Sequence, residues 1–108
     1  MDMDIKQEII NITNEIIEAT SVAKIYLFGS FAYGEPGNDS DIDLCIITND
    51  SHIRKRDLIK SIRKSILKVA TMPVDILIYD KEEFFNRAKI HSTIEHIIAN
   101  EGISIYEQ

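Results

Sequence analysis

The 108-residue sequence lacks several features that would place it in a particular class of protein. Its one cysteine, Cys45, leaves no partner for an internal disulfide, and its apolar surroundings predict a small core residue. No apolar run approaches membrane-spanning length and no signal peptide opens the chain, so we expect a cytoplasmic protein. Because the sequence also has no internal repeat, low-complexity tract or linker, we expect one domain over residues 1–108.

Acidic residues outnumber basic ones by 18 to 12, which gives a formal net charge of −6. This balance argues against broad nucleic-acid binding, which requires basic groups to neutralise phosphates, and is compatible with a basic protein partner. Seven basic residues nevertheless share one face of a helix predicted over 53–69. We interpret that face as the solvated side of the helix. The alternative is a patch that binds nucleotide phosphates, an acidic partner or RNA, in which residues 54–56 reach the mouth of an active site. The seven are Arg54, Lys55, Arg56, Lys60, Arg63, Lys64 and Lys68.

The spacing of apolar residues predicts an α/β fold. The expected class is a mixed four-stranded sheet with helices packed mainly on one face. The expected helices cover the start of the chain to about residue 20, a short turn from 31, 53–69, and 81–99 with a break near His91. The expected strands cover 25–28, 41–47, 74–79 and 103–106.

Three smaller expectations accompany this fold. The buried face of the helix over 53–69 should consist of Leu58, Ile59, Ile62, Ile66 and Leu67. Asp80 should cap the helical region that follows it. His91 and His96 are five residues apart, which places them on different faces of a continuous helix, so we expect them to be a poor metal pair.

The stretch from Lys24 to Ile47 carries the residues most typical of a binding site. Its apolar strand ends at Gly29, which has no Cβ and lets another group approach the main chain closely. Ser30 and a short helix follow, and a helix N-terminus beside a hydroxyl suits a phosphate. The stretch is neither a Walker loop, because no Gly-Lys-Ser/Thr follows Gly34, nor a Rossmann fingerprint.

Asp41 and Asp43 follow a loop over 35–40 and begin the next predicted strand. Their spacing points both side chains to one face, roughly 6.5 to 7 Å apart along the strand, while Ile42 points into a core. Two carboxylates this close repel each other, and Mg²⁺, which takes carboxylate and phosphate oxygens, removes the conflict. The alternative is an exposed strand end that caps a turn, and the preceding Gly29-Ser30 pair favours the metal site.

Asp75 is the one charged residue in the otherwise apolar strand over 74–79, and it lies near the start of that strand. If this strand lies beside the strand of Asp41 and Asp43, Asp75 completes a cluster of three carboxylates. It is then also the best candidate to accept, or orient, the proton of an attacking hydroxyl. The alternative is a strand-entry residue that faces solvent.

Gly29-Ser30, ten intervening residues and Asp41-x-Asp43 together resemble the signature of the DNA polymerase β-like nucleotidyltransferases. The length of the chain and its ending, 101–107, are similar to the minimal nucleotidyltransferase branch, so the resemblance covers nearly the whole chain. It implies that Asp41, Asp43 and Asp75 are catalytic and hold two Mg²⁺ ions. It also implies that Gly29 and Ser30, together with Asp41 and Asp43, bind the nucleotide, with ATP as the donor.

The same resemblance implies a partner. Minimal nucleotidyltransferases of this kind are commonly encoded beside a small helical protein with a HEPN domain, and the pair acts as a toxin–antitoxin system. The chain would then be the antitoxin, transferring AMP from ATP to a side chain of a HEPN-type toxin, such as a tyrosine. A homo-oligomer is compatible with this role.

Two hypotheses are alternatives to an enzyme that modifies a protein. One is a non-catalytic binding module that neutralises its partner by complex formation. The other is an enzyme that modifies a small molecule such as an aminoglycoside. The three carboxylates favour the protein-modifying enzyme, whereas Tyr33, at a position where the family often carries a basic residue, allows the binding module.

Overall fold

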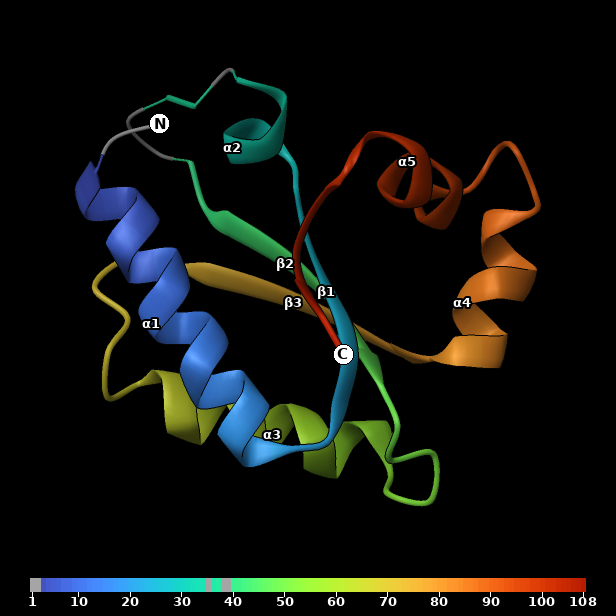
Figure 1. Cartoon of the computed structure of the whole chain (residues 1–108), viewed down its shortest axis with the longest axis horizontal. Helices are drawn as coiled ribbons and strands as arrows, with labels where there is room; N and C mark the ends of the chain where they lie inside the picture. Colours follow the sequence, from blue (N-terminus) through green and yellow to red (C-terminus); the bar gives the residue numbers. More distant parts are fainter. Residues whose placement is uncertain (1–2, 35, 38–39) are drawn as a thin grey trace.

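A four-stranded sheet in the order β3-β2-β1-β4 organises the computed structural model, which describes residues 3–34, 36–37 and 40–108. The predicted order of helices and strands is confirmed, with boundaries that differ by a few residues (Figure 1). Glu35, Asn38 and Asp39 of the predicted loop lie outside the described residues. The elements are α1 (Met3–Ala19), β1 (Val22–Phe28), α2 (Ser30–Tyr33), β2 (Ile42–Thr48), α3 (Lys55–Ile66), β3 (Val74–Asp80), α4 (Lys81–Ala88), α5 (Ile94–Glu101) and β4 (Ile103–Glu107).

The sheet is mixed, as the sequence predicts. β1 pairs antiparallel with both β2 and β4, and β2 pairs in parallel with β3. The parallel pair is connected through α3, because parallel neighbours require a crossover rather than a hairpin. β3 and β4 are therefore the two edge strands.

One face of the sheet carries the larger core. Side chains alternate between the two faces along a strand, and one alternating set packs against the apolar stripes of α1 and α3. This is the face that the two longest helices cover, on one side of the strands in Figure 1. Its fully buried residues are Ile12, Ile16, Ile25, Leu27, Ile42, Leu44, Ile46 and Ile62.

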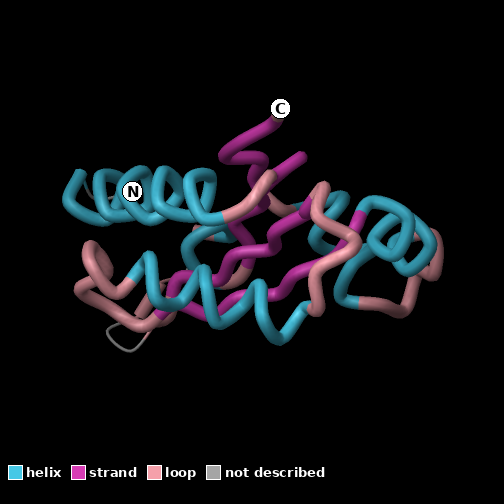
Figure 2. Tube along the Cα trace, turned by 90° about the horizontal axis from the view of Figure 1, so that it is seen from below, coloured by secondary structure: helices cyan, strands magenta, loops and turns pink. Residues whose placement is uncertain are grey.

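The other face carries a smaller cluster beneath α4 and α5, which lie on the opposite side of the strands from α1 and α3 (Figures 1 and 2). Phe84 of α4 packs there, its ring stacked on that of Tyr26 with centroids 5.7 Å apart. Ile98 of α5 joins it. Helices therefore cover part of the second face in addition to the expected one.

Two expectations about the helices are wrong. Leu67 is 79% exposed rather than buried, because the buried stripe of α3 consists of Leu58, Ile62 and Ile66 at steps of four, and the residue after Ile66 does not lie on that stripe. His91 and His96 do not lie on separate faces, because the break between α4 and α5 stacks their rings with centroids 4.5 Å apart. Thr93 makes this break, since its side chain accepts a hydrogen bond from the His96 N–H and caps α5.

Other expectations are confirmed. Asp80 caps α4 by accepting a hydrogen bond of 2.8 Å from the Glu83 N–H. Cys45 is fully buried, and burial raises the pKa of its thiol to about 12, as for an inert core residue. Among the residues the structure describes, no helix is both long and apolar enough to cross a bilayer.

Candidate functional site

The turn after β1 brings Gly29 against the start of β2. Gly29 has φ 75° and ψ −157°, and its carbonyl accepts hydrogen bonds of 3.0 Å from the N–H groups of Ala32 and Tyr33. A Cβ at Gly29 would lie 2.1 Å from Oδ2 of Asp43. Glycine is therefore required twice here, for the backbone angle and for the space that the Asp43 carboxylate occupies. The sequence predicted a close approach at this glycine, and in the structure the group that approaches is an aspartate of the chain itself.

The pairing of the strands places the predicted carboxylates in one row. Asp43 lies opposite Phe28 in the antiparallel β1–β2 pair and opposite Asp75 in the parallel β2–β3 pair. The expected neighbourhood of β2 and β3 is therefore confirmed. Asp43 is half-buried and Asp75 is exposed. Asp41 immediately precedes β2 instead of lying within it.

These carboxylates face the side of the sheet opposite the larger core. Ile42 is fully buried on the α1 and α3 side, and the next residue, Asp43, points the other way. Cys45 and Tyr79, which follow on the same face as Asp43 and Asp75, belong to the smaller cluster. The carboxylates therefore form the open end of a face whose other end is apolar.

Repulsion among the carboxylates affects the pKa of Asp43. Burial raises the pKa of its carboxyl above the ordinary value, and the charges of Asp75 and Asp41 and a hydrogen bond with Asp75 raise this pKa further. Like charges close together in a partly desolvated place make the ionised form costly. A bound cation would lower this cost.

The donor set fits Mg²⁺ in its chemistry. Carboxylate oxygens are hard ligands, and Mg²⁺ in proteins is commonly held by one or two carboxylates together with substrate phosphates. Over residues 3–34, 36–37 and 40–108, however, no group of three or more His, Cys, Asp or Glu side chains is arranged to hold a metal ion. The structure thus places Asp43 beside Asp75, and the charge of Asp41 contributes to the raised pKa of Asp43. The predicted cluster of three carboxylates is not formed.

Ser30 begins α2 directly after the glycine turn and is half-buried. Because α2 spans only four residues, it carries little of the dipole of a longer helix. Phosphate binding here would depend on local N–H groups and on the Ser30 hydroxyl. The phosphate-binding role of Gly29 and Ser30 stays a prediction.

The basic residues of α3 are exposed, as the interpretation of a solvated face requires. Lys55 forms an ion pair of 2.7 Å with Glu83 and lies over the ring of Tyr79, so it lies toward the end of β3 away from Asp75. Arg63, near the other end of α3, donates a hydrogen bond of 3.2 Å to the carbonyl of Val74, next to Asp75. Sequence reasoning looked for a basic residue of the site at 54–56 and missed this contact, because helical spacing does not show which end of the helix meets the start of β3.

Comparison with protein families matches residues 7–101 to the nucleotidyltransferase domain. No curated protein sequence matches the chain. The matched range contains the glycine turn and all three predicted carboxylates.

Several solved structures have a similar fold. A protein from Sulfolobus solfataricus assigned as a nucleotidyltransferase has a TM-score of 0.62 at 16% identity, over 100% of this chain and 90% of that one. A toxin–antitoxin complex with AMP-PNP has a TM-score of 0.63 at 18% identity, over 94% of this chain and 73% of that one. A MntA–HpeT toxin–antitoxin mutant with two Asp-to-Glu changes has a TM-score of 0.60 at 16% identity, with the same coverage. At these identities, the structural similarity shows the fold alone. The family match covers most of the chain, which therefore belongs to the nucleotidyltransferase domain family.

Proposed function

We propose that the chain is an antitoxin that transfers AMP from ATP to a hydroxyl group of a HEPN-type toxin. The observation that carries this proposal is the packing of the Asp43 carboxylate on Gly29 and beside Asp75. This arrangement places two carboxylates side by side at the glycine turn. The family supplies the reaction class, which is nucleotidyl transfer.

Each residue has a role in the proposed reaction. The Gly29 turn and the Ser30 hydroxyl would hold the β- and γ-phosphates, which orients the α-phosphorus toward the acceptor. The acceptor oxygen forms a bond to the α-phosphorus, the bond from this phosphorus to the bridging oxygen of the β-phosphate breaks, and pyrophosphate leaves. The acceptor proton passes to the carboxylate of Asp75, which is exposed and therefore reachable from solvent and from a docked protein.

Asp41, Asp43 and Asp75 would hold Mg²⁺, two ions in the full proposal. When bound, Mg²⁺ would neutralise charge on the triphosphate and lower the pKa of the acceptor hydroxyl. The raised pKa of Asp43 supports this role, because the chain has brought carboxylates together at an energetic cost that a cation would offset.

The choice of nucleotide and partner is supported by the neighbouring structures. One of them is a toxin–antitoxin complex with AMP-PNP, an analogue of ATP. Another carries substitutions of two aspartates two positions apart, the same spacing as that of Asp41 and Asp43. Both suggest a toxin partner for this chain, and the first also suggests an adenine nucleotide.

A non-catalytic antitoxin is the second candidate. It is favoured by the described carboxylates not forming a three-ligand metal group and by the exposed Tyr33 beside the turn. Such a protein would neutralise its toxin by covering a surface. The two candidates differ in whether the toxin becomes covalently modified.

The test is transfer of label from α-³²P-labelled ATP to the purified product of the adjacent gene, with and without Mg²⁺. We expect Mg²⁺-dependent labelling, and a loss of about 1,000-fold or more in the double variant Asp41→Asn/Asp43→Asn. Asp57→Asn, on the exposed side of α3, is the matched control and should label the partner as the wild type does. Toxin neutralisation without label, unchanged in the double variant, would sink the enzyme and leave the binding module.

A further inference from the structure

Positive charge is concentrated in the segment 54–68, which holds seven of the chain's twelve basic residues and one acidic residue, Asp57. All seven basic side chains are exposed. Lys55 pairs with Glu83, and within the part of the chain that the structure describes the other six form no ion pair. The segment has a formal charge of +6 and the whole chain has −6, which leaves −12 on the remainder. One helix of an acidic protein therefore presents a strongly basic surface.

Three of these residues form a basic stripe on the second half of α3. Lys60 and Lys64 are four residues apart and Arg63 is three from Lys60, so their side chains are neighbours on the helix surface, where like charges repel. The helix dipole favours basic groups in the last turn, which holds Arg63 and Lys64, but disfavours Arg54 and Arg56 at the start. The dipole alone therefore does not account for the run of positive charge, and a bound anionic group would offset its repulsion.

The basic stripe lies at the edge of the sheet beside Asp75. Nη1 of Arg63 donates a hydrogen bond of 3.2 Å to the carbonyl of Val74, the residue before Asp75, and β3 is an edge strand. The end of α3 and the start of β3 lie at the same end of the sheet, joined by the loop over 67–73 (Figure 1). Arg63 has five N–H donors, and this hydrogen bond uses one of them. A protein that reaches Asp75 from this edge therefore contacts the basic stripe.

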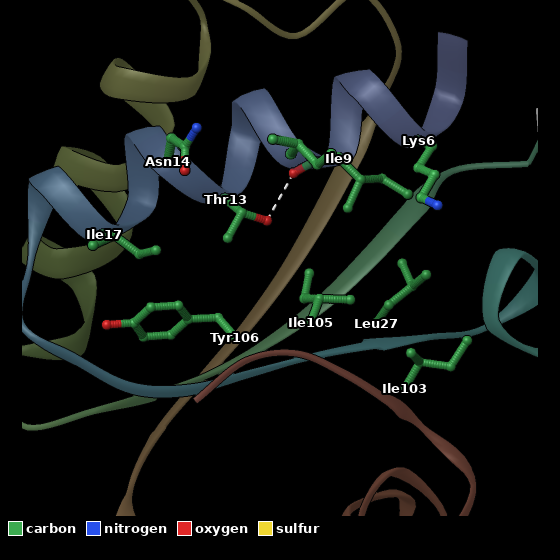
Figure 3. A pocket seen from close by; sticks show the side chains of 10 residues that line it. Lys6, Ile9, Thr13, Asn14, Ile17, Leu27, Ile103, Ile105 and Tyr106 are labelled. Carbon is green, nitrogen blue, oxygen red and sulfur yellow. Dashed lines mark hydrogen bonds between the residues drawn. The ribbon is translucent and has the colours of Figure 1, made fainter. Parts of the chain in front are cut away.

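The opposite edge of the sheet has a different character. Between α1 and β4 lies an open apolar groove of about 660 Å³, in which Lys6 is the one charged side chain among the lining residues (Figure 3). Aliphatic side chains such as Ile9, Leu27 and Ile105 line the rest of it. An acidic surface therefore finds charge complementarity at the β3 edge and little at the β4 edge.

We propose that the basic stripe docks an acidic surface of the acceptor protein at the β3 edge, a refinement that rests on the proposed function. Carboxylates of the acceptor would pair with the Arg63 guanidinium and with the ammonium groups of Lys60 and Lys64. Leu67 is 79% exposed and follows Arg63 by four residues, so it adds an apolar contact within the charged surface. The acceptor would span the edge and present its hydroxyl to Asp75 on the other face of the sheet.

The position of the stripe favours the acceptor over the nucleotide. In the proposed reaction the phosphates lie at Gly29 and Ser30, which follow β1, and β2 separates β1 from β3. Neighbouring strands are about 4.8 Å apart, so phosphates at the glycine turn would lie roughly 10 Å across the sheet from β3. Asp75, the proposed acceptor of the proton, is the site residue next to the stripe. The stripe therefore lies on the side of the site from which the acceptor hydroxyl would approach.

Two other anionic occupants fit the stripe less well. RNA is disfavoured because residues 54–68 contain no aromatic side chain on which a base could stack, and because the chain as a whole is acidic. In a two-fold dimer centred on the stripe, the stripe would face its own copy, and equal charges would repel each other. An acidic surface of a different protein requires neither base stacking nor symmetry.

The test measures the affinity of the chain for the acceptor of the transfer assay, the purified product of the adjacent gene, by biolayer interferometry. We expect Lys60→Glu/Lys64→Glu to weaken binding by about tenfold or more and to remove most of its dependence on salt, because the charge complementarity is lost. Lys81→Glu/Lys89→Glu is the matched control, since it changes the net charge equally at exposed positions of the α4 region. This control should change the affinity less than twofold.

Steady-state kinetics of transfer distinguishes the acceptor from the nucleotide. Lys60→Glu/Lys64→Glu should raise KM for the acceptor and leave KM for ATP as in the wild type. A rise in KM for ATP alone would assign the stripe to the triphosphate and overturn the proposal. Leu67→Ala should also weaken acceptor binding, whereas Phe85→Ala, at a residue 65% exposed on α4, should not.

Two further measurements separate this inference from the proposed activity. Asp41→Asn/Asp43→Asn should bind the acceptor as the wild type does even if transfer is lost, and Lys60→Glu/Lys64→Glu should still bind Mg²⁺ and ATP. Circular dichroism melting of each variant verifies that the fold is intact. Wild-type acceptor affinity in Lys60→Glu/Lys64→Glu would overturn the proposal, as would a loss confined to binding of an RNA duplex or to self-association of the chain.

Discussion

Two neighbouring residues of β2 show how differently the two faces of the sheet are used. Ile42 is 0% exposed and packs against the helices α1 and α3. Asp43, the next residue, faces the opposite side, where it lies against Gly29 and has a raised pKa. One face therefore provides most of the stability, and the other accepts an electrostatic cost at the place where the chemistry is proposed.

This division explains why a small protein can hold carboxylates close together. The larger core is continuous across β1, β2 and β3, and it includes Ile42 and Val74, the chain neighbours of Asp43 and Asp75. Strain and repulsion at functional residues persist when surrounding structure fixes the backbone. Substitution of a core residue should therefore lower the stability of the fold, whereas removal of a carboxylate charge on the other face should raise it.

The largest expected effect on stability concerns the sheet face that α1 and α3 cover. Leu44→Ala removes a fully buried side chain and should lower the free energy of unfolding by about 2–5 kcal/mol, from lost burial and the cavity left behind. The measurement is urea unfolding followed by circular dichroism. The control Leu67→Ala, at a residue 79% exposed, should stay within about 0.5 kcal/mol. Equal losses at the two positions would contradict the assignment of the core.

The next effect concerns the glycine turn and compares two glycines that both have positive φ. Gly29→Ala places a Cβ 2.1 Å from Asp43 Oδ2, whereas a Cβ at Gly34 meets nothing within 4 Å. Both variants are strained, with φ of 75° and 80°, but only the first displaces the carboxylate. We expect AMP transfer to fall by about 100-fold in Gly29→Ala and by only a few-fold in Gly34→Ala. Equal activities would show that the contact with Asp43 has no part in function.

The smallest effect is a stabilisation on the opposite face, at the end that carries the carboxylates. Because the pKa of Asp43 is higher in the folded state, the stability that this group contributes is present at low pH and is lost as the pH rises through the raised pKa. Asp43→Asn should therefore melt higher than the wild type at neutral pH, by roughly 2 °C given solvent screening, and about equally near pH 3. Thermal melts at both pH values measure this difference. A lower melting temperature at neutral pH would mean that the ionised carboxylate stabilises the fold.

The sequence was sufficient for the parts of the structure that depend on local spacing. Alternation along β2 predicted a buried Ile42, and one charge in an apolar strand singled out Asp75. The order of elements and the mixed sheet followed from periodicity and turn residues. The direction of side chains along a strand and the order of elements are set by neighbours in the chain, so a sequence can reveal them, and the mixed sheet was inferred from that order.

What the sequence could not show depends on contacts between distant elements. The cap at Thr93 begins α5 after the break that follows α4. This arrangement stacks His91 on His96, and it places Ile98 on the second face of the sheet. The contact of Arg63 with Val74 depends on where α3 ends relative to β3. Helical spacing describes one element at a time and does not contain these relations.

The central claim, that the open face gathers carboxylates for a cation and a nucleotide, is tested most directly by a carbon-13 NMR titration of the aspartate side chains. We predict that the pKa of Asp43 lies above its ordinary value and falls when Mg²⁺ and ATP are added. Asp50 is the internal control, because hydrogen bonds from Thr20 and Ser21 lower its pKa, and Mg²⁺ should leave that pKa unchanged. An ordinary pKa at Asp43 that Mg²⁺ and ATP do not alter would contradict the account.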